Sequence, residues 1–355
     1  MIARTPSKIA ALLCFFLATP CLAQNPDAVT PKASSAVDRA LVWLKQNQQP
    51  DGSFRSGGAA GQTAITSLAV LAFLARGNVP GQGPYGDAIN SAIDYVLAGQ
   101  RLDGPKKGLI ARDESNAMMY EHGIATVMLA EVYGMVDGIR RAKIDRALAL
   151  ATQLIIDSQR AEKINPRDTG GWRYALDSPD ADISVTGWQL MALRGAGNCG
   201  AAVPAQTLRQ GAEYVRRCAS SKGGFAYQAD GGEPNLARTG SGILSLILIG
   251  TDRSSAEVRK AADYLLANPP SHSAPFYYYA AYYDSQALKQ LAGRYWQTGY
   301  PKLVDDLLTL QEPAGAFAST ADPTEDQAGP AYRTSLAVLA LCVPYRYLPL
   351  YEADN

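Results

Sequence analysis

Hydrophobic positions between about residues 35 and 345 recur as pairs of helical segments. The first segment of each pair is amphipathic and carries charges, as Arg259, Lys260 and Asp263 do in one of them. The second segment is almost entirely apolar and opens on small polar residues. An amphipathic helix covers a core from outside, whereas a helix that is apolar all round is itself buried. The pattern therefore predicts an all-α fold with an outer and an inner ring of helices.

The apolar segments start at six places, at intervals of roughly 45 to 65 residues, which is the range of a two-helix repeat. The residues that mark these starts are Thr66, His122, Thr186, Thr239, Asp284 and Thr334. An open array of hairpins would need polar capping repeats at its ends, and the sequence has none that we recognise. We expect six helical hairpins that close into an α/α toroid.

A short motif precedes most of the apolar segments. Residues 48–54 and 311–317 both read Gln-x3-Gly-x-Phe, and Gln100 to Gly104 repeats the first half of that pattern. The second half, glycine followed by an aromatic residue, returns at Gly171-Trp172 and at Gly224-Phe225. These are five of the six copies that six hairpins require. Glycine after a helical run is the residue that takes the left-handed conformation ending a helix.

These copies resemble the repeats of the terpenoid cyclase and protein prenyltransferase superfamily. The resemblance covers about residues 35–345 and implies one toroid of six inner and six outer helices. It leaves the chemistry open, because toroids of this type also serve polysaccharide lyases and thioester proteins.

Triterpene cyclases of that superfamily protonate their substrate with an Asp-x-Asp-Asp motif. The nearest match is Asp180-Ala181-Asp182-Ile183, in which the fourth carboxylate is missing. Two carboxylates close together can still raise one pKa and create a general acid. The alternative is that Asp182 simply caps the helix that begins there.

Protein prenyltransferases of the superfamily bind zinc through Asp, Cys and His near inner-helix starts. The residues that fall at these positions are Asn235, Ala237 and Arg333, which cannot complete a zinc site. We therefore expect no metal and no cofactor.

Other candidates gather near the inner-helix starts, where a toroid of this kind opens. His122 is a candidate general base, with structural burial as the alternative. Tyrosine outnumbers phenylalanine by 19 to 7, which suits a wet wall that stacks on apolar or sugar faces. The residues expected to line a cavity are Glu121, Trp172, Tyr174, Thr239, Tyr279, Tyr283, Asp284 and Arg333.

The N-terminus reads as a cleaved signal peptide, residues 1–23. Arg4 and Lys8 precede the apolar run Ile9–Ala18, and a small-x-small site ends at Ala23. The apolar run is too short for a stable membrane span. We expect a periplasmic or secreted bacterial protein with a flexible lead at 24–34, a single toroid at 35–355, and a proline-bearing C-terminal clasp at 343–355.

Cleavage of that peptide leaves three cysteines. Cys199 and Cys218 flank one helical run, so a disulfide between them is one expectation and two buried thiols are the other.

The charge balance, 33 basic against 33 acidic residues, argues against a nucleic-acid partner. Three function classes stay open. The first is a non-catalytic binding or scaffold protein of the cell envelope, with an envelope protein as partner. The second is a polysaccharide lyase or hydrolase with a tyrosine-lined cavity, whose candidate groups are Asp180, Asp182, Glu121, His122 and Asp284. Hydrolysis would need two carboxylates that face each other, and Asp182 and Asp284 at distant positions would exclude that pair. The third is an isoprenoid-binding or cyclase-like enzyme with Asp182 as acid.

Overall fold

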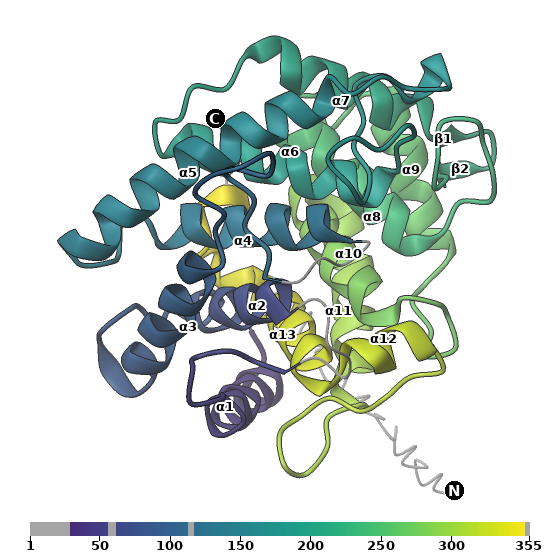
Figure 1. Ribbon diagram of the computed structural model, residues 1–355. Helices are drawn as coiled ribbons and strands as arrows, with labels where there is room; N and C mark the ends of the chain where they lie inside the picture. Colours follow the sequence, from purple (N-terminus) through teal and green to yellow (C-terminus); the bar gives the residue numbers. More distant parts are fainter. Residues whose placement is uncertain (1–28, 56–61, 113–116, 352–355) are drawn as a thin grey trace, which may run out of the picture.

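The computed structural model describes residues 29–55, 62–112 and 117–351. Six helices of the described chain form an inner ring: α2 (Gln62–Ala75), α4 (Met118–Val132), α6 (Ile183–Asn198), α8 (Leu236–Leu248), α10 (Tyr277–Leu291) and α13 (Pro330–Leu341). Six lie outside them: α1 (Pro31–Gln46), α3 (Gly86–Ala98), α5 (Gly138–Gln159), α7 (Ala205–Arg217), α9 (Ala256–Ala267) and α11 (Gly293–Leu308). Figure 1 shows α1, α3, α5, α7 and α9 around the periphery.

Shorter elements complete the described chain. They are α12 (Pro323–Ala328), the two-stranded sheet of β1 (Ala219–Ser220) and β2 (Gly223–Phe225), and the 3-10 helices η1 (Gly83–Tyr85), η2 (Pro166–Asp168), η3 (Val343–Tyr345) and η4 (Pro349–Tyr351). The two strands pair antiparallel.

The inner ring is closed. Each inner helix packs against the next, and α13 packs back against α2, while in the outer layer α11 contacts α1. The inner helices are buried along nearly their whole length, as their uniform apolar pattern predicts. The predicted all-α toroid of six hairpins is confirmed.

The glutamine of the repeat motif ties neighbouring hairpins together. The Gln48 side chain donates to Gly52 O at 2.9 Å in its own turn and to Ala88 O at 2.8 Å on the next outer helix. Gln311 does the same with Gly315 O at 3.0 Å and, across the ring closure, with Ala36 O at 2.7 Å. The motif is therefore a joint between adjacent hairpins.

Two details of the predicted repeat were wrong. In the second copy Gln100 binds Gly108 O at 3.2 Å, so Gly108 and not Gly104 is the equivalent glycine. Gln159 supplies the third joint by binding Gly170 O at 2.8 Å, which the Gln-x3-Gly spacing did not reveal because eleven positions separate the two residues.

Two boundaries also differ. Residues 31–34 are the first turn of α1, capped by Thr30, whose hydroxyl accepts from Ala33 N at 3.2 Å, so the lead is shorter than expected. The fifth inner helix starts at Tyr277, so Asp284 lies in its middle. The expected signal peptide, residues 1–23, lies outside the described residues.

The C-terminal residues 343–351, here called the plug, cover the C-terminal ends of the inner helices. Leu350 N donates to Glu131 Oε1 at 2.8 Å, and the hydroxyls of Tyr351 and Tyr282 share a hydrogen bond of 2.5 Å. Arg76, just after α2, lies 4.8 Å from the Tyr345 ring centre. The plug thus contacts the first, second and fifth inner helices.

Candidate functional site

Asp182 is the N-cap of α6 and is fully buried. Its Oδ1 accepts hydrogen bonds of 2.9 Å from Ser184 N and Val185 N, whereas Oδ2 has no hydrogen-bond partner among the described residues. Burial raises the pKa of Asp182 to about 7, against the opposing effects of the two backbone bonds, of nearby Arg173 and of the Tyr227 hydroxyl, which lies close to the carboxyl without meeting hydrogen-bond geometry. A substantial fraction of this carboxyl is therefore neutral at pH 7, and because Oδ1 is occupied as an acceptor, the proton belongs on Oδ2.

Asp180 has a different role from the one the carboxylate pair suggested. It forms an ion pair with Arg173, with Nη1 and Oδ2 2.7 Å apart, and 39% of its side chain is exposed. Burial, and not the neighbouring Asp180, is the main cause of the raised pKa of Asp182. The motif supplies one buried acid and one ion-pair partner for the adjacent arginine.

Five tyrosines, here called the tyrosine ring, gather at the N-terminal ends of the inner helices. Three of them are the third residues of α4, α10 and α13, and two lie in the segments that lead into α6 and α8. They are Tyr120, Tyr279, Tyr332, Tyr174 and Tyr227.

Contacts link three of these tyrosines in a row and place Arg173 beside two of them. The rings of Tyr120 and Tyr174 are 5.9 Å apart, and the Tyr174 and Tyr227 hydroxyls are hydrogen-bonded. The Arg173 guanidinium lies 4.8 Å from the Tyr174 ring centre and 5.4 Å from that of Tyr227. A negative charge on Asp182 would raise the pKa of Tyr120, Tyr227 and Tyr279, as expected for hydroxyls in the neighbourhood of the carboxyl.

The tyrosine ring is not packed core. Each of the five side chains keeps part of its surface accessible, although burial raises the pKa of Tyr120, Tyr279 and Tyr332 well above the ordinary value. Partly accessible tyrosines can contact a ligand through both their ring faces and their hydroxyls.

Below the tyrosine ring the aromatic residues are fully buried. Trp188 stacks on Tyr282 with ring centres 5.7 Å apart, and Tyr283 packs edge-on against Trp188 at the same distance. The Trp188 indole donates to the Tyr279 hydroxyl at 3.0 Å, which fixes that ring. Tyr283, expected to line a cavity, is fully buried in this layer.

His122 is fully buried and both of its ring nitrogens face backbone groups. Nδ1 accepts from Ile110 N at 3.1 Å, and Nε2 lies 3.2 Å from Ala151 O. Burial lowers its pKa to about 4, so the ring is neutral at pH 7. Thr66, Thr186, Thr239 and Thr334 accept the equivalent backbone bond in other hairpins. His122 thus occupies the same joint position as these threonines.

Three other expected cavity residues also make internal bonds. Trp172 is buried against Gly211 of α7 and donates to Ile155 O at 2.8 Å. Thr239 accepts from Phe225 N at 3.1 Å. Arg333 is 7% exposed and pairs with Asp326 at 3.0 Å. None of the three belongs to the tyrosine ring.

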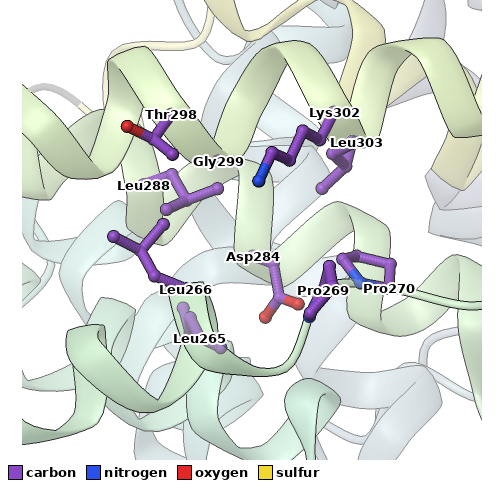
Figure 2. Close-up of a pocket in the computed structure, with 10 residues that line it drawn as sticks. All are labelled: Leu265, Leu266, Pro269, Pro270, Asp284, Leu288, Thr298, Gly299, Lys302 and Leu303. Atoms are coloured by element: carbon purple, nitrogen blue, oxygen red, sulfur yellow. The ribbon is translucent and has the colours of Figure 1, made fainter.

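Asp284 faces away from Asp182. It is 2% exposed and lies in a small pocket between α9, α10 and α11, with Leu265 and Leu288 among the walls and Lys302 also lining the pocket (Figure 2). Burial alone raises its pKa well above the ordinary value. Asp182 and Asp284 therefore do not converge as the pair that glycoside hydrolysis requires. Glu121 is buried on α4.

The expected Cys199–Cys218 disulfide was wrong. Cys199 is the C-cap of α6 and Cys218 is the C-cap of α7. The 13 residues of α7 lie between them and span roughly 20 Å, far more than a disulfide bridges. The Cys199 thiol donates to Ala130 O at 3.4 Å on α4, and Cys218 is buried. Both cysteines are free.

Sequence reasoning missed Arg173, Tyr120, Tyr227 and Tyr332. A signal for one of them was present, because Tyr227 follows Phe225 at the same distance as Tyr174 follows Trp172. If the alignment of the Gly-Trp and Gly-Phe copies is extended by two residues, Tyr174 and Tyr227 fall at equivalent positions, which predicts that both lie at one site.

Among the described residues, no group of three His, Cys, Asp or Glu side chains is arranged to hold a metal ion. None of the helices described is both long enough and apolar enough to cross a membrane.

Residues 3–162 and 177–342 match the prenyltransferase alpha-alpha toroid domain, and the chain belongs to that family. No curated protein matches its sequence. Among solved structures, it is similar to a type II terpene cyclase from Scytonema, with TM-score 0.57 and 14% identity over 90% of this chain and 100% of that one. It is also similar to an α-1,6-mannanase of Salegentibacter sp. HEL1_6 bound to α-1,6-mannotriose, with TM-score 0.64 and 10% identity over 88% and 99%. At such identities the likeness concerns the fold alone.

Proposed function

We propose that this toroid binds an apolar, isoprenoid-like ligand at the tyrosine ring and that neutral Asp182 donates a proton to it. The observation that carries the proposal is the buried Asp182 carboxyl, with one oxygen fixed by two backbone N–H groups and the other without a partner. A related fold, the Scytonema cyclase, has been solved with geranylgeranyl dihydroxybenzoate.

The chemistry follows from the two states of Asp182. Proton transfer from Oδ2 to a ligand double bond forms a C–H bond and leaves a carbocation on the ligand and a carboxylate on Asp182. The carboxylate keeps its two backbone bonds and the nearby Arg173 charge, and tyrosine faces attract the cation. The cation then gives a proton to water, which forms an alkene and hydronium, and solvent returns a proton to the Asp182 carboxylate.

The hydrolase alternative has less support. Hydrolysis needs two carboxyls that flank one bond. Asp284 points into a different pocket and Asp180 is paired with Arg173. Glu325 is also buried near the tyrosine ring, but both of its oxygens accept backbone bonds, from Tyr278 N at 3.1 Å and Tyr279 N at 3.0 Å.

The test is ligand binding and turnover with Asp182→Asn. Asparagine caps helices as well as aspartate does, so the variant keeps α6 while it removes the acid. We expect geranylgeraniol and squalene to raise the melting temperature of both proteins, because a ligand that binds only the folded state stabilises it. Mass spectrometry should detect a product with the native protein and none with Asp182→Asn.

Asp180→Asn is the matched control, because it changes a neighbouring carboxyl that is 39% exposed and does not cap α6. It should retain turnover. If the native protein binds an isoprenoid without converting it, the protein is a binding protein and not an enzyme. If no isoprenoid stabilises it, the proposal is excluded in favour of an envelope scaffold.

Export is a separate part of the proposal. The charge and apolar pattern of residues 1–23 supports a signal peptide, and N-terminal sequencing of protein secreted by a bacterial host should begin at Gln24.

A further inference from the structure

One of the turns that lead into an inner helix lacks the repeat motif. Residues 268–276 join α9 to α10 and read Asn-Pro-Pro-Ser-His-Ser-Ala-Pro-Phe, with no glycine before an aromatic residue. In four of the other turns a buried aromatic side chain follows the glycine and its backbone N–H binds a threonine of the inner helix, and in the turn before α4 Ile110 and His122 take these places. These aromatic residues are Phe54, Trp172, Phe225 and Phe317.

A pocket of about 200 Å³ lies beside this proline-rich loop. Its walls come from the start of α8, the end of α9, the loop itself and the start of α10. Tyr264, Tyr277, Asn235 and Asn268 are among them. No residue that lines it, all within the described chain, carries a charge. The break in the repeat thus coincides with an open, neutral pocket.

We propose that this pocket binds one neutral sugar ring. A pyranose has apolar C–H faces and hydroxyls around its edge, which match walls that combine tyrosine, proline and amide groups. An enclosed apolar cavity of about 150 Å³ holds benzene. An open pocket of about 200 Å³ therefore admits a single six-membered ring.

The two amides offer complementary groups to a hydroxyl. Asn235 Oδ1 accepts from Arg238 N at 2.9 Å, which leaves the NH2 group of this side chain as a donor. Asn268 Nδ2 donates to Tyr264 O at 2.9 Å, which leaves its Oδ1 as an acceptor. A sugar hydroxyl both donates and accepts, so one asparagine of each kind satisfies it.

Hydrogen bonds to other residues of the protein hold the two tyrosine side chains of the pocket wall in place. The Tyr264 hydroxyl donates to Pro234 O at 3.0 Å, and that of Tyr277 donates to Asp306 Oδ2 at 2.5 Å. Fixed rings lose little entropy when a ligand packs on them. A charged ligand would enter without a counter-charge, which costs binding free energy.

The experiment is saturation-transfer NMR on the full-length protein with methyl α-mannopyranoside and methyl β-glucopyranoside at millimolar concentration, against glucuronate and glucosamine as charged counterparts. We expect transfer to at least one neutral glycoside and none to the charged sugars. Asp182→Asn should bind the sugar as the native protein does, because this pocket does not depend on the proposed function of the tyrosine ring.

Two variants locate the site. Ala274→Trp fills the pocket and should weaken binding by about tenfold or more. Ser273→Trp adds the same bulk at the neighbouring exposed residue, which does not line the pocket, and should bind as the native protein does. If Ala274→Trp fails to fold, Asn268→Ala removes the free acceptor and should also weaken binding.

Three results would overturn the proposal. They are the absence of binding by every neutral glycoside, equal binding by the charged sugars, and unchanged affinity in both Ala274→Trp and Asn268→Ala.

Discussion

The two ends of the inner barrel are both rich in tyrosine, and they use it differently. At the plug end the Tyr282 and Tyr351 hydroxyls bond each other, and both side chains are buried. At the opposite end, where Asp182 caps α6, the five members of the tyrosine ring keep accessible surface. The comparison teaches that tyrosine content alone does not mark a site; the site is the end at which accessible polar surface and an unpartnered acid oxygen occur together.

Removing the plug should cause the largest loss of stability at either end of the barrel. A chain that ends at Val343 loses Leu348, Leu350 and Tyr351, all buried. Burial of such side chains contributes about 1.5 to 3 kcal/mol each, so we expect a loss of about 5 kcal/mol in the free energy of unfolding, measured by urea denaturation. A chain that ends at Tyr351 is the control and should match the full-length protein. Equal stability of all three would mean that the barrel does not need its plug.

Removing one tyrosine hydroxyl at each end should reveal a difference in stability between the buried end and the accessible end. Tyr282→Phe leaves the buried Tyr351 hydroxyl without its partner, which costs about 1 to 3 kcal/mol. Tyr174→Phe removes a hydroxyl at the accessible end, where water can bind the Tyr227 hydroxyl instead, and should cost less than 1 kcal/mol. Chemical denaturation of the two variants gives both values. A larger loss for Tyr174→Phe would reverse our assignment of the two ends.

The smallest expected effect is a pH dependence. Burial raises the pKa of Glu131, beneath the plug, to about 7, although the Leu350 N–H opposes this shift. A carboxyl whose pKa is raised on folding contributes stability that is full below its unfolded pKa, near 4.3, and is lost as the pH rises through 7. Glu131→Gln keeps the acceptor for Leu350 and cannot ionise, so its melting temperature should fall by about 2 °C less than that of the native protein between pH 5 and 8.

Asp182→Asn tests the same pH dependence of stability at the end of the barrel that carries the tyrosine ring, because burial also raises the pKa of Asp182 to about 7. A pH dependence that persists unchanged in both variants would place the responsible groups elsewhere, with Glu325 as the next candidate.

The sequence predicted the architecture because the repeat is a physical joint. Glycine, glutamine and the threonine that accepts a backbone bond recur at most of the hairpins for the same local reason. The prediction failed at the fifth inner helix, where that joint is absent. Without a marking threonine, the start was placed at Asp284 and not at Tyr277.

The site was predicted in part. Asp182, Tyr174 and Tyr279 lie together as their positions near helix starts suggested. Asp284 does not, because a shift of register along α10 turns its side chain toward the outer helices. His122 looked reactive by residue type, yet only its environment reveals that it replaces a threonine of the joint.

The Gln311 side chain reaches Ala36 across 275 positions of sequence, and this bond has a consequence for how the protein is made. The first hairpin lacks its neighbour on one side until the last has been synthesised. Such long-range contacts slow folding, since the chain must close a large loop before it gains them. During translation, the N-terminal hairpins cannot make their contacts with the last hairpin until it has been synthesised. The ring can therefore close only after nearly all of the chain has left the ribosome.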